Sequence, residues 1–201
     1  MKPPFCRRCG CSLYPAAGDG HVCGACLANQ PLYGRARAGF IYEEPLTALL
    51  HGLKYRADFS TLPVLAELIR PLQEQLGVNR EDDRVVPVPL HRSRLMNRGF
   101  NQSLLLAALF FSGAQSLILP QTLLRVRNTA PQTSLDGMAR RKNLTGAFAV
   151  SDASLIRGRR VFLVDDVFTT GTTVNECSRT LLAAGAIDVE VLTVARVARL
   201  E

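Results

Sequence analysis

The chain has 201 residues, 47% of them apolar, and a formal net charge of +7 at pH 7. That length fits one domain of ordinary size with a small appendage. The longest uninterrupted apolar run extends only from Leu104 to Phe111, whereas a membrane helix needs about 18 apolar residues, so a membrane span is excluded. The first residues lack the apolar core of a signal peptide, and we therefore expect a cytoplasmic protein.

Two Cys-x-x-Cys pairs open the chain, with 13 residues between them. Their four thiols are Cys6, Cys9, Cys23 and Cys26. This spacing is typical of a tetrahedral Zn²⁺ site, and four protein ligands leave no position for a catalytic water, so we predict a structural zinc. Two disulfides are the competing interpretation, which a cytoplasmic location disfavours. Cys11 and His21 could replace a ligand, although the symmetric spacing argues against both.

The cysteine segment is a predicted small domain over residues 1–32, because about 30 residues cannot bury enough surface to fold without such a metal. The second predicted domain, residues 33–201, alternates strands with helices. We predict strands at 38–42, 85–89, 121–126, 161–164 and 189–194, and helices at 45–55, 63–76, 102–111 and 172–184. This order predicts an α/β fold with a mainly parallel sheet flanked by helices, and a ligand site at the carboxyl ends of the strands.

Two of these elements have unusual sequences. The strand at 85–89 contains Pro87 and Pro89, which favour a sheet position with unusual pairing. The helix at 102–111, with Asn101 as its N-cap, is apolar nearly all round. Such a helix is buried on most sides, here between the sheet and another subunit, so a homodimer is one expected assembly.

The basic residues are concentrated in the middle of the chain. Residues 84–142 contain nine arginines and lysines against one acid, Asp136, so this stretch alone has an excess charge of +8. Such a concentration favours a polyanionic ligand, either a pyrophosphate, a nucleic acid or both; a solvated basic face is the alternative. Residues 125–143 also show little apolar periodicity, which predicts a long mobile loop of the kind that is usually functional.

Residues 161–173 contain the most specific pattern in the chain. Four apolar residues precede Asp165 and Asp166, which we place where the strand ends, and a Thr-rich turn then opens a helix. Gly171 lets the backbone approach a ligand, and hydroxyls beside a helix N-terminus favour a phosphate. The hydroxyls belong to Thr169, Thr170, Thr172 and Thr173. Carboxylates would repel a phosphate, so the two aspartates are expected to bind sugar hydroxyls or Mg²⁺. Taken without the rest of the pattern, an Asp-Asp pair at the end of a strand more often only caps a helix.

The stretch 161–173 resembles the phosphoribosyl pyrophosphate (PRPP) signature of type I phosphoribosyltransferases. Together with the four-Cys segment and two further stretches, 86–102 and 125–148, it makes the whole chain similar to the ComF/GntX family of competence-associated, phosphoribosyltransferase-like bacterial proteins. The resemblance implies a type I phosphoribosyltransferase-like fold, binding of PRPP and Mg²⁺, and a role in DNA uptake or in the use of external DNA.

The resemblance also implies roles for individual residues. Asp165 and Asp166 become the catalytic residues that hold the ribose hydroxyls or Mg²⁺, and residues 169–173 bind the 5′-phosphate. The loop after Pro89 meets the pyrophosphate, and residues 125–142 form a flap that closes over PRPP. Because a guanidinium pairs with two phosphate oxygens at once, the cations of this loop and flap are candidate PRPP ligands. They are Arg92, Arg94, Arg98, Arg140, Arg141 and Lys142.

The acceptor is not identified by these residues, so three functions stay open. The protein transfers a phosphoribosyl group to an unknown acceptor, or it senses PRPP without catalysis, or it is an accessory protein that binds single-stranded DNA through its zinc segment and basic surface. Its expected partners are PRPP, single-stranded DNA and other DNA-uptake proteins. We favour the transferase, which would be a glycosyltransferase that transfers a pentosyl group.

Overall fold

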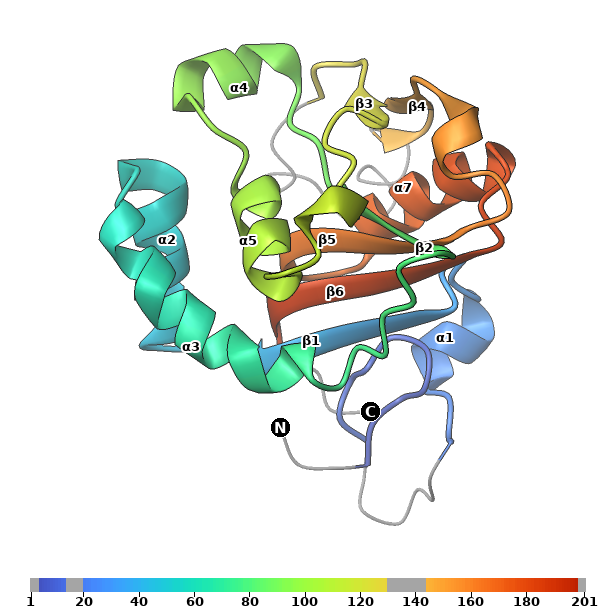
Figure 1. The fold of residues 1–201 in the computed structure, drawn as a ribbon. Helices are drawn as coiled ribbons and strands as arrows, with labels where there is room; N and C mark the ends of the chain where they lie inside the picture. Colours follow the sequence, from blue (N-terminus) through green and yellow to red (C-terminus); the bar gives the residue numbers. More distant parts are fainter. Residues whose placement is uncertain (1–3, 14–19, 130–143, 199–201) are drawn as a thin grey trace.

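A parallel sheet forms the centre of the protein, whose computed structural model describes residues 4–13, 20–129 and 144–198. The sheet has four strands in the order β1-β6-β5-β2, and every neighbouring pair is parallel (Figure 1). The strands are β1 (Arg35–Ile41), β2 (Asp83–Pro87), β5 (Arg160–Phe168) and β6 (Asp188–Arg196). The two central strands are buried along most of their length, as in parallel sheets covered on both faces. The predicted α/β fold is therefore confirmed.

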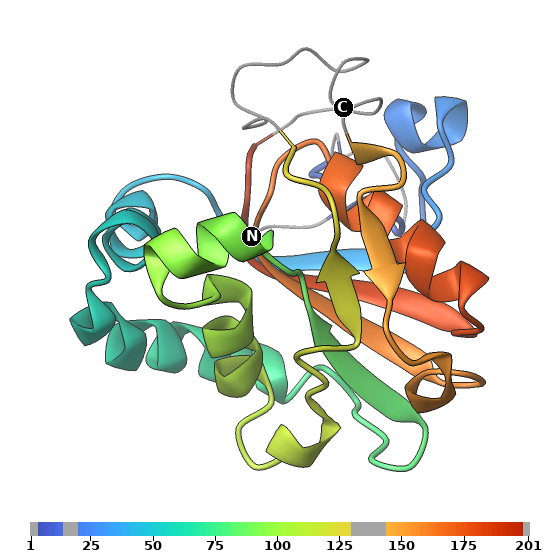
Figure 2. The ribbon, with the colours of Figure 1, turned by 90° about the horizontal axis from the view of Figure 1, so that it is seen from above.

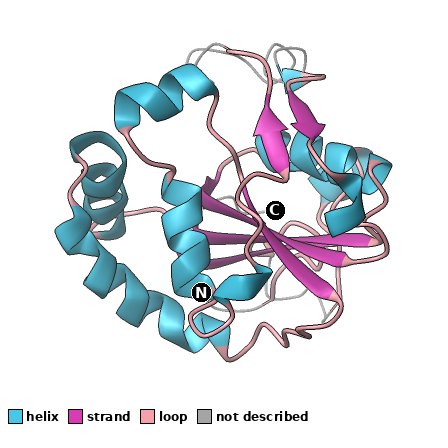
Figure 3. Ribbon diagram, turned by 45° about the horizontal axis from the view of Figure 1, so that its top comes forward, coloured by secondary structure: helices cyan, strands magenta, loops and turns pink. Residues whose placement is uncertain are grey.

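Helices cover both faces of this sheet (Figures 2 and 3). On one side lie α2 (Leu46–Arg56), α3 (Leu62–Gln73) and α5 (Gln102–Phe110), and on the other lie α7 (Thr172–Ala183) and a small antiparallel sheet of β3 (Leu123–Arg125) and β4 (Phe148–Val150). Phe162 and Val164 of β5 share a core with the first group, whereas Val161 and Leu163 share a core with the second. The alternation of side chains along β5 therefore separates two core layers.

Shorter elements connect these layers. They are α1 (Gly24–Ala28), α4 (Arg92–Arg98) and the 3₁₀ helices η1 (Phe59–Thr61), η2 (Gln115–Leu117) and η4 (Ala153–Leu155). Within the described part of the chain, no helix combines the length and the apolar content needed to cross a bilayer.

The N-terminal cysteine segment packs against the sheet at β1 and β6 (Figure 1). The backbone N–H of Ala36 donates to the carbonyl of Arg8 at 2.7 Å, and the guanidinium of Arg8 donates to the carbonyl of Gly34 at 3.2 Å. From the end of β6, Arg196 donates to the carbonyl of Cys9 at 2.5 Å. The segment is thus hydrogen-bonded to the start of one strand and to the end of its neighbour. The division into residues 1–32 and 33–201 stays a prediction.

The predicted end of the strand at 161–164 is wrong. β5 continues to Phe168, because its residues after Val164 still pair with β6, up to Phe168 opposite Arg196. Pairing with β2 does stop at Val164, which lies opposite Pro87. Asp165 and Asp166 therefore lie within the strand, at the point where only one neighbour remains. No local sequence signal reports how far a partner strand extends.

Some of the other predicted elements are confirmed and others differ in type or extent. α4 occupies residues expected to be a loop, and β1 begins three residues before the predicted 38–42. The N-cap role of Asn101 is confirmed, since its side chain accepts from the N–H of Ser103. β2 is an edge strand of the sheet. Prolines are tolerated in edge strands, which explains the prolines of the stretch 85–89. α5 shares its core with α3 of the same chain, so its burial does not require a second subunit.

Candidate functional site

Asp165 and Asp166 are held by two helices from the same face of the sheet. The ammonium group of Lys54, in the last turn of α2, donates to Oδ2 of Asp166 at 2.7 Å. The hydroxyl of Ser103, in the first turn of α5, donates to Oδ1 of Asp165 at 3.0 Å. The other oxygen of Asp166 accepts from the N–H of Val167. Oδ2 of Asp165 has no hydrogen-bond donor among the described residues, which leaves it open to a ligand.

The charges of Asp165, Asp166 and Lys54 shift the pKa values of their neighbours. Burial and the neighbouring charge of Asp166 raise the pKa of Asp165 to about 7, although Lys54 acts in the opposite direction. Burial by itself would lower the pKa of Lys54, but the attraction of Asp166 outweighs it and the pKa is raised. The site therefore contains one ion pair and one carboxylate that changes protonation near neutral pH.

The loop after β5 has the geometry of an anion site. Gly171 has a φ of 76°, and a Cβ at this position would lie 2.8 Å from Cζ of Phe168, so only glycine fits without displacing the ring. The first helical hydrogen bond of α7 runs from the N–H of Asn175 to the carbonyl of Gly171. The hydroxyls of Thr170 and Thr172 lie 2.9 Å apart at this helix N-terminus. Threonine hydroxyls therefore lie at the N-terminus of α7, where a phosphate is favoured.

The arginines of α4 extend toward different neighbours. Arg94 donates to the carbonyl of Thr129 at 2.7 Å, which joins α4 to the start of the predicted flap. Arg98 donates to Gln102 and its guanidinium lies 5.9 Å from the ring centre of Tyr55 in α2. Arg92 is exposed. These residues do not converge on one point. Arg140, Arg141 and Lys142 lie outside the described residues.

Two cations near the aspartates were not among the predicted site residues. One is Lys54, which follows the apolar stripe of its helix and lies four positions after Leu50, so its placement on the buried face was readable from helical periodicity. The other is Arg125 of β3, whose Nε is buried without a hydrogen-bond partner and whose guanidinium lies 5.6 Å from the ring centre of Phe148. Burial and the neighbouring Arg94 lower the pKa of Arg125. No local pattern distinguishes this arginine from a surface one.

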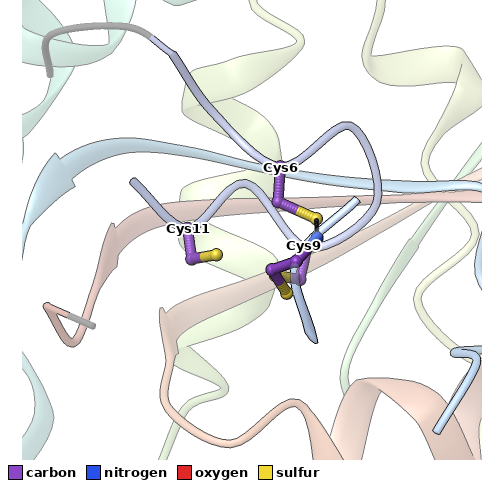
Figure 4. A group of neighbouring side chains, drawn as sticks. Cys6, Cys9 and Cys11 are labelled. Atoms are coloured by element: carbon purple, nitrogen blue, oxygen red, sulfur yellow. Dashed lines mark hydrogen bonds between the residues drawn. The ribbon is translucent and has the colours of Figure 1, made fainter. Parts of the chain in front are cut away.

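Cysteine side chains of the N-terminal segment gather into one cluster, in which Figure 4 labels Cys6, Cys9 and Cys11. The ligand atoms of four of them lie within 4.8 Å of one another. These four are Cys6, Cys9, Cys11 and Cys23. The sulfurs of Cys9 and Cys23 are 3.7 Å apart, close to the roughly 3.8 Å between sulfurs around a tetrahedral zinc with bonds of about 2.3 Å. All six cysteines of the chain are free thiols, so the disulfide interpretation finds no support.

Three of the four predicted zinc ligands thus belong to this group, with Cys11 in the fourth place. Cys26 is buried in α1 and also interacts with Cys9 and Cys23. Burial favours the neutral thiol of Cys6, but backbone N–H groups, among them that of Cys23 at 3.3 Å, outweigh it and lower the pKa to about 7. The cluster therefore has the donors for a structural metal, with five sulfurs available for four positions.

Comparisons with known proteins agree with this arrangement. Residues 108–200 match the family model of the phosphoribosyl transferase domain. The chain is 38% identical over 201 residues to the DNA utilization protein YhgH of Salmonella typhimurium, covering 98% of this chain and 86% of that protein. It is 32% identical over 197 residues to competence protein F of Haemophilus influenzae, covering 96% and 85%. It is also 32% identical over 162 residues to competence protein ComFC of Streptococcus pneumoniae, covering 80% and 67%.

Proposed function

This chain belongs to the ComF/GntX family of DNA utilization and competence proteins, and from that premise we propose that it binds PRPP at the carboxyl end of β5. One observation carries the proposal: the Asp165–Asp166 pair and the anion-binding loop at Gly171 follow each other on one strand and one helix N-terminus. A ribose 5-phosphate has the matching order of groups, with hydroxyls on its ring and an anion at its end. The 5′-phosphate then occupies the loop and the ribose hydroxyls donate to the open oxygen of Asp165.

The reaction that fits this arrangement is phosphoribosyl transfer. The bond from C1 of the ribose to pyrophosphate breaks, the pyrophosphate leaves with the electron pair, and a nucleophilic acceptor forms the new bond to C1. Positive charge develops on the ribose, and negative charge develops on the leaving group, where arginines stabilise it. Arg94 and Arg125, whose charges influence each other and the second of which also interacts with Asp165, belong to the proposed set. The other members are Arg92, Arg98, Arg140, Arg141 and Lys142.

The protein's own groups fit Mg²⁺ only in part. Oδ2 of Asp166 already accepts from the ammonium group of Lys54, which makes this oxygen a poor ligand for a second cation. Oδ2 of Asp165 is the carboxylate oxygen that could contact the ion. When bound together with PRPP, Mg²⁺ would neutralise charge on the pyrophosphate. Lys54 would fix the orientation of the Asp166 carboxylate beside the ribose.

For the cysteine cluster we propose structural zinc, with Cys6, Cys9 and Cys23 as three of the ligands. The fourth is Cys26, because a Cys-x-x-Cys pair at the start of a short helix folds both sulfurs around one ion. The metal would hold a segment too small to have a core of its own.

A second candidate function is supported by an aromatic surface next to the aspartates. Tyr55 is 66% exposed, its ring lies 5.3 Å from that of His51, and Lys54 and Arg98 each lie 5.9 Å from its centre. Exposed aromatic rings beside cations suit stacked bases of single-stranded nucleic acid. We therefore keep a single-stranded-DNA-binding or PRPP-sensing accessory role, acting in the cytoplasm with other DNA-uptake proteins, as the alternative to the transferase.

Two measurements separate these proposals. Isothermal titration calorimetry with PRPP and Mg²⁺ should give saturable binding that the double variant Asp165→Asn, Asp166→Asn weakens strongly. Equal affinity of the wild type and the double variant would reject the site. Pyrophosphate release in the presence of nucleobases, nucleosides or oligonucleotides then tests transfer, and binding without release under all acceptors would favour the sensing role.

A further inference from the structure

A cavity of about 470 Å³ lies between the anion-binding loop and the cysteine segment. The loop residues Thr169 to Thr172 form one wall, and Cys9, Cys23 and Cys26 form the opposite wall. Asp165 and Asp166 do not line it. The carboxylates therefore lie outside the cavity, which extends from the loop proposed for the 5′-phosphate to the cysteine segment.

The cavity wall contains a buried cation without a carboxylate partner among the described residues. Arg196 is only 2% exposed, and no carboxylate of the described residues lies within 4.0 Å of its guanidinium. One terminal nitrogen donates to the carbonyl of Cys9 at 2.5 Å, and the group lies 5.3 Å from the ring centre of Phe168. Its Nε is buried with no hydrogen-bond partner. A buried guanidinium with an unused donor is unfavourable unless an anion or acceptor completes it.

The remaining lining suits a nucleotide. Two aromatic rings, Tyr33 and Phe168, line the cavity, and the amide side chains of Asn29, Gln30 and Asn175 add polar groups. Glu176 is the carboxylate on the wall, and it is paired with Arg179 at 2.7 Å. Aromatic surface, amides and a single cation match a base and a phosphate, and the volume lies within the range of ligand pockets, which is roughly 300–1,000 Å³.

We propose that this cavity binds a nucleotide joined to the 5′-phosphate of the ribose. The 5′-phosphate of such a ligand binds at the loop, and the attached nucleotide extends beyond it into the cavity. Arg196 contacts the phosphate of that nucleotide, and the cysteine segment forms the outer wall of the subsite. The inference rests on the proposed function, because it takes the loop at Gly171 as the site of the ribose 5-phosphate. It gives the cysteine segment a direct part in ligand recognition.

The test compares ligands that differ only beyond the 5′-phosphate. Calorimetry on the zinc-loaded full chain measures the affinity for ribose 5-phosphate, for PRPP and for ADP-ribose, in which adenosine monophosphate is attached to the phosphate of a ribose 5-phosphate. We expect ADP-ribose to bind at least about tenfold more tightly than ribose 5-phosphate, since one charge-assisted contact contributes that much. Equal affinities for these two ligands would overturn the inference.

A matched pair of variants locates the effect. Ala25 lines the cavity and is exposed at its rim, whereas Ala28 is exposed on the same short helix and is not on the cavity wall. Ala25→Trp should remove the advantage of ADP-ribose while leaving ribose 5-phosphate and PRPP unchanged, and Ala28→Trp should keep it. If both variants retain the advantage, ADP-ribose binds elsewhere and the inference fails.

The variant Arg196→Lys distinguishes a role of Arg196 in binding ADP-ribose from a role in stabilising the cysteine site. We expect about a tenfold loss for ADP-ribose and little change for ribose 5-phosphate, with the zinc content unchanged. If the variant instead loses zinc and keeps the ratio of the two affinities, Arg196 only offsets the charge of the cysteine site and the proposed contact is wrong. Should PRPP also fail to bind the wild type, the proposed function falls and this inference falls with it; PRPP binding without an ADP-ribose advantage overturns this inference alone.

Discussion

The ammonium group of Lys54 lies 2.7 Å from Oδ2 of Asp166 and so joins the end of α2 to the carboxyl end of β5. This contact introduces a cation beside two adjacent carboxylates in a largely buried environment. Without it, two negative charges on neighbouring residues would repel each other with little solvent to screen them. Lys54 therefore opposes the rise in the pKa of Asp165 that burial and the charge of Asp166 cause.

Lys54→Met should shift the pH dependence of PRPP binding. Loss of the ammonium group removes the attraction that keeps the pKa of Asp165 from rising beyond about 7. At pH 7 the carboxylate would then be mostly protonated, and the affinity should fall roughly tenfold for each unit by which the pKa rises. Affinity should recover near pH 9, as calorimetry across the pH range would measure. Lys54→Arg keeps the charge and serves as the control; a loss that is independent of pH would contradict this role.

Asp165→Asn should stabilise the fold above neutral pH while weakening PRPP binding. The pKa of Asp165 is about 7 in the folded chain, against about 3.9 in an unfolded one. The folded state therefore binds this proton more tightly, and the resulting stability is complete below about pH 4 and is lost as the pH rises through 7. Asparagine has no proton to lose, so Tm at pH 8 should rise by roughly 10 °C, with little change at pH 4. Parallel curves of Tm against pH for the two proteins would contradict the shift.

Gly171→Ala should disturb both the loop and the fold, and Gly158→Ala is its matched control. The two glycines have φ of 76° and 70°, so alanine is strained at both. At Gly158 nothing lies within 4 Å of the added Cβ, whereas at Gly171 the ring of Phe168 would have to shift. We expect about 1 kcal/mol of destabilisation at Gly158 from the backbone alone and more at Gly171, in urea unfolding. PRPP affinity should fall only in the Gly171 variant; an equal effect of both variants would exclude the contact with Phe168 as the cause.

The sequence was sufficient for the α/β fold and the loop at Gly171, because helical and strand periodicity, a glycine and a run of threonines are local signals. Helical periodicity could place Lys54 on the buried face of its helix, but neither its contact with Asp166 nor the place of Arg125 could be predicted, since each residue becomes part of the site only when a distant element packs against β5. The end of that strand was misplaced for the same reason, because β6 pairs with it past Val164. Contacts made through tertiary packing leave no spacing pattern along the chain.

Replacing single cysteines should identify the fourth zinc ligand. Cys26→Ser should release the metal, because the pair formed with Cys23 would lose one sulfur, whereas Cys11→Ser should retain about one zinc per chain. Cys177→Ser, in the buried part of α7, is the control that should leave zinc unchanged. Metal analysis of protein purified without chelator measures all three. Loss of zinc from the Cys11 variant and retention by the Cys26 variant would instead assign the group whose ligand atoms lie within 4.8 Å.

DNA binding, if the accessory role holds, should be electrostatic and independent of sequence. Residues 84–142 have an excess charge of +8, whereas reading base edges requires an element that presents a fixed set of side chains to a groove, and the described residues offer no such element. Affinity for single-stranded oligonucleotides should therefore fall steeply with salt, with a slope that reports the number of phosphates neutralised. Tyr55→Ala should weaken binding at every salt concentration without changing that slope, because stacking on the ring carries no charge.

Competition with PRPP completes this test, since arginines shared between the two ligands cannot neutralise both polyanions at once. PRPP with Mg²⁺ should then displace a fluorescent oligonucleotide, as fluorescence anisotropy would measure, and the displacement should be lost in the Asp165→Asn, Asp166→Asn variant that no longer holds PRPP. Salt-insensitive or sequence-specific binding would reject the electrostatic account. Absence of binding at low salt would remove direct DNA contact from the function of this chain and leave any role in DNA use to its protein partners.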